Sequence, residues 1–136
     1  MTAALSTGAI ATPADGPVSW TERADESEAA AVILTSERPY DGPVTLTASA
    51  APTFDEIAGI ASELTGRDIR RVVMDDEDWV AAQAAHGTPE TAARFMLGFY
   101  QAARDGRFAG TDPLLAELLG REPRTVRDLL AERVGA

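Results

Sequence analysis

Two side chains of this sequence are suited to acid–base chemistry: His86, the single histidine, and Tyr100. An unperturbed histidine titrates near neutral pH, so His86 could act as a general acid or base if it faced a cavity. It also precedes Gly87 at the expected end of a helix, where the helix dipole favours a cation. A catalytic role, shared with Tyr100, and a purely structural role therefore both stay open.

Charged residues offer two further possibilities. Arg23 could hold an anionic substrate, because a guanidinium group forms strong paired hydrogen bonds with a carboxylate. Alternatively, Arg23 pairs with Asp25 or a nearby acid and fixes the start of a helix. The consecutive acidic residues 75–78 do not predict a metal site, because they point in different directions around a helix start, where the dipole already favours acids.

Large apolar side chains gather in one part of an otherwise alanine-rich chain. Their spacing makes helical neighbours of Phe95 and Phe99, and of Met96 and Tyr100. Core packing explains such spacing, and the alternative is an apolar ligand pocket or an oligomer contact. For a pocket, the candidate substrate-binding residues are Trp20, Arg23, Trp79, Phe95, Met96 and Phe99.

Composition excludes several kinds of chemistry. The 136 residues include no cysteine and only one histidine, which excludes thiol catalysis, disulfides and a multi-histidine metal site within one chain. All twelve basic residues are arginines, so no lysine can form a Schiff base. The formal net charge of −10 argues against nucleic acid and anionic membranes as partners. With no long apolar run and no basic leader, the expected location is cytoplasmic.

The order of expected elements predicts an α/β (α+β) fold. It has a small sheet of two or three short strands, about five helices and a helical C-terminal third. Residues 1–17 are expected to form an extended or flexible arm ahead of a single domain at 18–136. Short β-branched runs predict strands at 18–21, 43–47 and 68–74.

Helix boundaries have recognisable signals. A capping box at Thr53–Glu56 opens a helix that Gly66 should end. Asp25 and Thr88 are expected N-caps of two others, and Asp75 or Asp76 that of a third. A short helix at 114–119 should stop at Gly120, and Thr125 should cap the last helix.

Several segments resemble NmrA-like proteins, which are atypical short-chain dehydrogenases related to NAD(P)H:quinone reductases. The segment at 16–31 is similar to a stretch that these proteins carry late in their chain. The other matching segments, in the same order as in the family, are 44–48, 52–58, 65–67 and 118–128. The resemblance covers about residues 8–134. It implies the C-terminal, substrate-facing portion of such a protein, without the glycine-rich turn of the Rossmann half that precedes it.

From this resemblance we expect a stand-alone small-molecule-binding domain. One interpretation makes it a cofactor-independent isomerase or cyclase on an apolar metabolite of bacterial secondary metabolism. The alternatives are a non-catalytic sensor or interaction subunit, a partner half of a split NAD(P)-dependent oxidoreductase, or an inactive remnant of a dehydrogenase. NAD(P) is expected only if a partner chain supplies the Rossmann half, and no other cofactor or metal is expected. A missing half would leave apolar surface exposed, which predicts a homo-oligomer or a partner protein.

Overall fold

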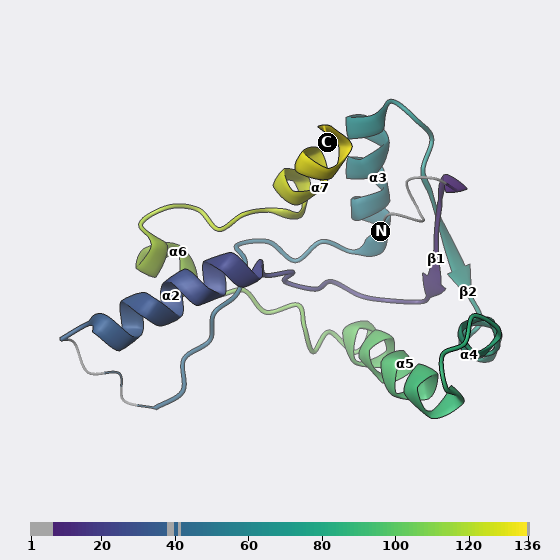
Figure 1. The fold of residues 1–136 in the computed structure, drawn as a ribbon, viewed down its shortest axis with the longest axis horizontal. Coiled ribbons are helices and arrows are strands. Elements are labelled where there is room, and N and C mark those ends of the chain that lie inside the picture. Colours follow the sequence, from purple (N-terminus) through teal and green to yellow (C-terminus); the bar gives the residue numbers. More distant parts are fainter. Residues whose placement is uncertain (1–6, 38–39, 41, 136) are drawn as a thin grey trace.

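The computed structural model describes residues 7–37, 40 and 42–135. Figure 1 shows a small sheet flanked by helices, with one helical arm extending away from it. The fold is mixed α/β, and its C-terminal third is helical, as the sequence predicts. The described elements are β1 (Ala9–Pro13), α2 (Arg23–Thr35), α3 (Phe54–Thr65), β2 (Arg70–Met74), α4 (Asp76–Ala85), α5 (Glu90–Arg104), α6 (Leu114–Leu119) and α7 (Val126–Gly135).

The sheet consists of two parallel strands. β1 pairs with β2 in a register that joins Ala9 to Arg70 and Pro13 to Met74, and α3 lies in the crossover between them. The main core forms where α3 packs against this sheet and α7 packs against α3. Its buried residues are Ile10, Ile57, Ala58, Ala61, Ile69 and Leu130.

Helix α3 forms where its sequence signals place it. Thr53 Oγ1 accepts from the Glu56 amide, and the Glu56 carboxylate accepts from the Thr53 amide at 2.7 Å, which completes the capping box. Gly66 ends the helix with a φ of 66°, a left-handed conformation that glycine adopts without strain. Ile57, Ala58 and Ala61 then face the core together.

Helices α4 and α5 form a second, smaller core beside the carboxyl ends of the strands. Trp79 and Val80 of α4 pack against Ala93 and Leu97 of α5. Asp75 caps α4 as predicted, its carboxylate accepting from the Glu77 amide at 2.9 Å.

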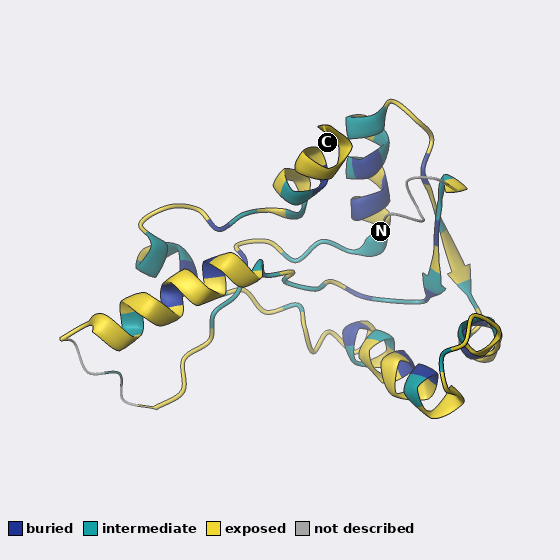
Figure 2. Ribbon diagram, in the orientation of Figure 1, coloured by how far each residue is buried: buried dark blue, intermediate teal, exposed yellow. Residues whose placement is uncertain are grey.

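The helical arm consists of α2 and α6, which lie together at one end of the molecule (Figure 1). Most of α2 is exposed in Figure 2, but Asp25 is fully buried. Its two carboxylate oxygens accept from Arg121 Nη2 at 2.8 Å and from the Arg124 amide at 2.6 Å. One buried carboxylate thus joins α2 to the chain between α6 and α7.

Three sequence-based predictions of strands need correction. Residues 9–13, placed in the extended or flexible arm, form β1, and both Ile10 and Pro13 are buried. The segments 18–21 and 43–47 are not strands. The amides of Val18 and Ser19 donate instead to the carbonyls of Pro52 and Phe108, which lie in loops and not in a neighbouring strand.

Two predicted helix caps are also wrong. Glu22, not Asp25, caps α2 by accepting from the Ala24 amide, and Asp25 is free to point inward. Pro89, not Thr88, precedes α5, and no side chain caps that helix. None of the helices formed by the described residues is long and apolar enough to cross a membrane.

Candidate functional site

A pocket of about 440 Å³ opens just beyond the carboxyl end of β1. In open α/β sheets, ligands bind outside the carboxyl ends of the strands, so this position favours a functional pocket. Its walls come from the segment after β1, the start of α3, the length of α5 and the loop after α5. We call it the aromatic pocket, and it is lined by Asp15, Val18, Trp20, Phe54, Met96, Phe99, Tyr100, Ala103 and Phe108.

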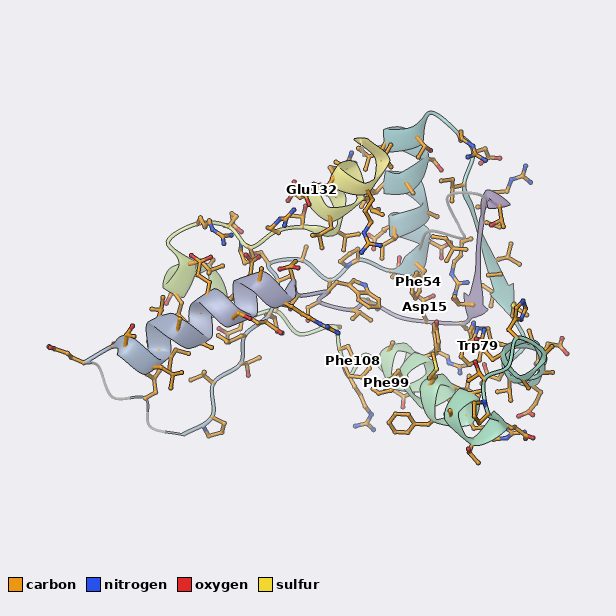
Figure 3. The ribbon with its side chains drawn as sticks, viewed as in Figure 1. Asp15, Phe54, Trp79, Phe99, Phe108 and Glu132 are labelled. Atoms are coloured by element: carbon orange, nitrogen blue, oxygen red, sulfur yellow. The ribbon has the colours of Figure 1, made fainter. Side chains whose placement is uncertain are left out.

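Contacts between rings hold the walls of the aromatic pocket in place. The Trp20 and Phe54 rings meet edge to face with centroids 5.7 Å apart, and Phe54 stacks on Tyr100 at 6.2 Å. Across the pocket, Phe99 stacks on Phe108 at 6.4 Å. Figure 3 shows Phe99 on α5 beside Phe108. The exposed ring faces can stack on a planar ligand.

A buried ion pair stands behind the aromatic pocket. Arg71 Nη2 lies 2.9 Å from Asp15 Oδ1, and the two side chains are only 3% and 9% exposed. The Arg71 guanidinium also donates to the carbonyls of Thr12 and Pro13 at the end of β1, and its Cζ lies 5.6 Å from the Phe54 ring centroid. Arg71 therefore fixes the strand end from which the pocket wall continues.

Asp15 connects Arg71 to helix α3, because its carboxylate bonds to both. Its second oxygen, Oδ2, accepts from the Phe54 amide at 2.9 Å, at the N-terminus of α3. Both carboxylate oxygens are thus engaged by the protein. Asp15 is consequently suited to positioning the pocket and poorly placed to act as a general base.

Among the described lining residues, polar groups come from Asp15, from the hydroxyl of Tyr100 and from the indole N–H of Trp20. Burial raises the pKa of Tyr100; the positive charge of Arg71 opposes this rise, and the negative charge of Asp15 adds to it. The hydroxyl therefore stays protonated at neutral pH. Together, these groups can bind and orient an apolar ligand, and a protonated phenol is their only candidate proton donor.

The structure brings four of the predicted site residues together and leaves the others apart. Trp20, Met96, Phe99 and Tyr100 line the aromatic pocket, while Trp79 packs behind Tyr100 with ring centroids 5.3 Å apart. Phe95 is 71% exposed and touches the pocket only through the Phe99 ring, at 5.2 Å.

His86 and Arg23 lie outside the aromatic pocket. The exposed His86 ring contacts the Ala82 carbonyl through Nδ1 at 2.7 Å, at the end of α4, which matches the structural role left open by the sequence. Arg23 does not pair with Asp25, which is bound by Arg121 instead.

Asp15, Phe54 and Phe108 belong to the pocket but were not among the candidate residues. A signal for Asp15 was present, because a polar residue soon after a parallel strand points to the edge where ligands bind. The sequence hides this signal, because residues 9–13 resemble an extended or flexible arm more than a strand. Phe54 reaches the pocket from the start of α3 and Phe108 from the loop after α5, and no local pattern encodes how these two segments meet the pocket.

Gly16 is required because the segment after β1 passes very close to the backbone of α5. A Cβ atom there would lie 2.1 Å from the Ala103 carbonyl oxygen, which is backbone and cannot swing aside. Gly16→Ala should therefore lower the free energy of unfolding by about 1–3 kcal/mol, measured by urea denaturation. Gly98→Ala, within α5 and with open space around its Cβ, is the control and should be neutral or stabilising. Equal effects of the two variants would contradict the close contact.

No family model matches the sequence. The chain is 25% identical over 123 residues to an NmrA-like family domain-containing oxidoreductase, flvB, of Aspergillus flavus, covering 88% of this chain and 40% of that protein. It is 27% identical over 122 residues to the NAD(P)H azoreductase of Xenophilus azovorans, covering 90% and 43%. It superposes on the triphenylmethane reductase of Citrobacter sp., complexed with NADP(H), with a TM-score of 0.86 and 28% identity, covering 98% and 46%.

The chain is similar to one part of an NmrA-like oxidoreductase. This confirms the resemblance found in the sequence. The chain spans less than half the length of the NmrA-like and azoreductase relatives described above. Their names describe NAD(P)H-dependent or other oxidoreductases, so they give no support to the expected cofactor-independent isomerase or cyclase.

The described residues do not fit an NADP(H) pyrophosphate at the strand ends. Such a group is bound by free amides at a helix N-terminus after a glycine-rich turn. After β1, the Asp15 carboxylate already occupies the first amide of α3. After β2, helix α4 begins with acidic residues, and Asp75 accepts from the Glu77 amide. Carboxylates at both positions would repel a phosphate.

Proposed function

We propose that this chain supplies the substrate-binding part of an NAD(P)H-dependent oxidoreductase and that its aromatic pocket binds a planar aromatic acceptor. The observation that carries the proposal is the set of ring faces around a pocket at the carboxyl end of β1. The volume of about 440 Å³ falls within the range of about 300–1,000 Å³ that is usual for small-molecule sites. Similarity to an azoreductase and a triphenylmethane reductase supports an aromatic ligand.

In this proposal the chain's own residues bind and orient the acceptor. Stacking on an aromatic side chain contributes about 0.5–1.5 kcal/mol beyond buried area, so rings on opposite walls fix the plane of the ligand. The Tyr100 hydroxyl, kept protonated by its buried setting, can donate to an oxygen or nitrogen of the ligand. The dinucleotide would be bound by another part of the oxidoreductase, not by the residues that the structure describes, and it would supply the hydride.

Binding of menadione, a neutral planar quinone, tests the proposal. We expect saturable quenching of tryptophan fluorescence, because Trp20 lines the pocket. Phe99→Ala should weaken binding about tenfold through the loss of one stacking wall. Phe95→Ala is the matched control: it removes the same side chain from the same helix but does not remove a lining residue, and it should change the affinity less than twofold.

Two results would contradict the aromatic pocket as the binding site. One is the absence of saturable menadione binding by the folded chain. The other is an equal loss of affinity in Phe99→Ala and Phe95→Ala, which would indicate a nonspecific exposed patch.

A further inference from the structure

A second apolar pocket, of about 370 Å³, lies between α3 and α7. We call it the α3–α7 pocket. Its apolar body is formed by Ile57 of α3 and by Leu129 and Leu130 of α7, and Trp20 and Phe54 close one side. These last two side chains also line the aromatic pocket, so the two pockets share one pair of rings.

Arg133 is the one charged side chain among the described residues that line the α3–α7 pocket. It makes no ion pair with any residue in the described part of the chain. Two neighbouring arginines are paired: Arg124, just before α7, with Glu132, and Arg127, within α7, with Glu63. A cation without a partner among the described residues is unexpected in a chain with 22 acidic and only 12 basic residues.

The helix dipole does not by itself explain this arrangement. Arg133 lies in the last turn of α7, where a cation is favoured. Arg104 holds the corresponding position in α5, yet it is paired with Asp76 at 2.9 Å. What distinguishes Arg133 is therefore the apolar pocket beside it and the absence of a described carboxylate partner.

We propose that the α3–α7 pocket binds an apolar monocarboxylate. The hydrocarbon body would lie against Ile57, Leu129 and Leu130, and the carboxylate would pair with the Arg133 guanidinium, whose planar fork matches it. The net charge of −10 opposes the approach of anions in general, so selectivity for a carboxylate must arise locally from Arg133. This proposal concerns a different pocket and does not depend on the function of the aromatic pocket.

Calorimetric titration with octanoate, compared with octanol, tests the charge requirement. We expect octanoate to bind the chain more tightly than octanol. Arg133→Gln should weaken octanoate binding about tenfold or more and leave octanol binding unchanged. Arg127→Gln is the matched control on the same helix, because Arg127 is paired with Glu63 and does not line the pocket, and it should leave both affinities unchanged.

An NMR signal fixes the location of binding. The indole N–H resonance of Trp20 should shift with octanoate, while that of the buried Trp79 should not. Because Trp20 lines both pockets, loss of this shift in Arg133→Gln assigns it to the α3–α7 pocket, which alone contains Arg133. Arg133 is exposed, so its variant should fold, and an unchanged melting curve checks this.

The proposal is overturned if octanoate does not bind at millimolar concentration, if octanol binds as tightly, or if Arg133→Gln and Arg127→Gln behave alike. Menadione binding should be unaffected by Arg133→Gln. Failure of the α3–α7 pocket therefore remains distinguishable from failure of the aromatic pocket.

Discussion

Replacing Arg71 with methionine should lower the free energy of unfolding by about 3–5 kcal/mol. The side chain is almost fully buried, and its removal leaves the Asp15 carboxylate as an uncompensated charge in an apolar setting. The Thr12 and Pro13 carbonyls lose a donor at the same time. Urea denaturation followed by circular dichroism gives the loss directly.

Two further variants separate the ion pair from general effects on β2. Arg70→Met changes the neighbouring residue, whose ion pair with Asp68 is exposed on both sides, and should cost less than about 1 kcal/mol. Arg71→Lys keeps the charge but loses the planar fork, so its cost should be intermediate. A cost for Arg71→Met no larger than that for Arg70→Met would show that the buried pair does not hold the pocket wall.

Asp25→Ala should lower the free energy of unfolding by about 2–3 kcal/mol. The fully buried carboxylate accepts from the Arg124 amide, which would be left without a partner, and from Arg121. Arg121 keeps its pairing with the exposed Glu28, which limits the loss. The free energy of unfolding from urea denaturation is the measurement.

Asp25→Asn provides the informative comparison. Its amide oxygen can still accept from the Arg124 N–H, so it should recover part of the stability lost in Asp25→Ala. Glu28→Ala, which removes the exposed partner of Arg121, is the control and should cost less than about 1 kcal/mol. A cost for Asp25→Ala as small as that for Glu28→Ala would mean that α2 is not anchored through this residue.

Helices were predictable from the sequence because their signals are local. The capping box at Thr53, the N-cap Asp75 and the stops at Gly66 and Gly120 act within a few residues of one another, and each is found where expected. Strands depend on a partner elsewhere in the chain. The small residues of β1 carry little β-forming signal, and they form a strand because β2 lies beside them.

The sequence predicts several of the residues that form the candidate site, but not how they are arranged in space. The aromatic residues of α5 identify a pocket wall because their helical spacing aligns them. Asp15 and Phe54, 39 residues apart, meet only through the crossover from β1 to α3, so their contact has no local signature. The partner of Asp25 was missed for the same reason, since Arg121 lies far away in sequence.

The wall formed by Trp20 and Phe54 has a thermodynamic consequence. Since both rings face the aromatic pocket and the α3–α7 pocket, a molecule that displaces them from one side reshapes the other. Linkage then requires reciprocity: the factor by which a first ligand changes the affinity for a second equals the factor by which the second changes the affinity for the first. Two different ligands, one in each pocket, would then change each other's affinity through the shared side chains of Trp20 and Phe54.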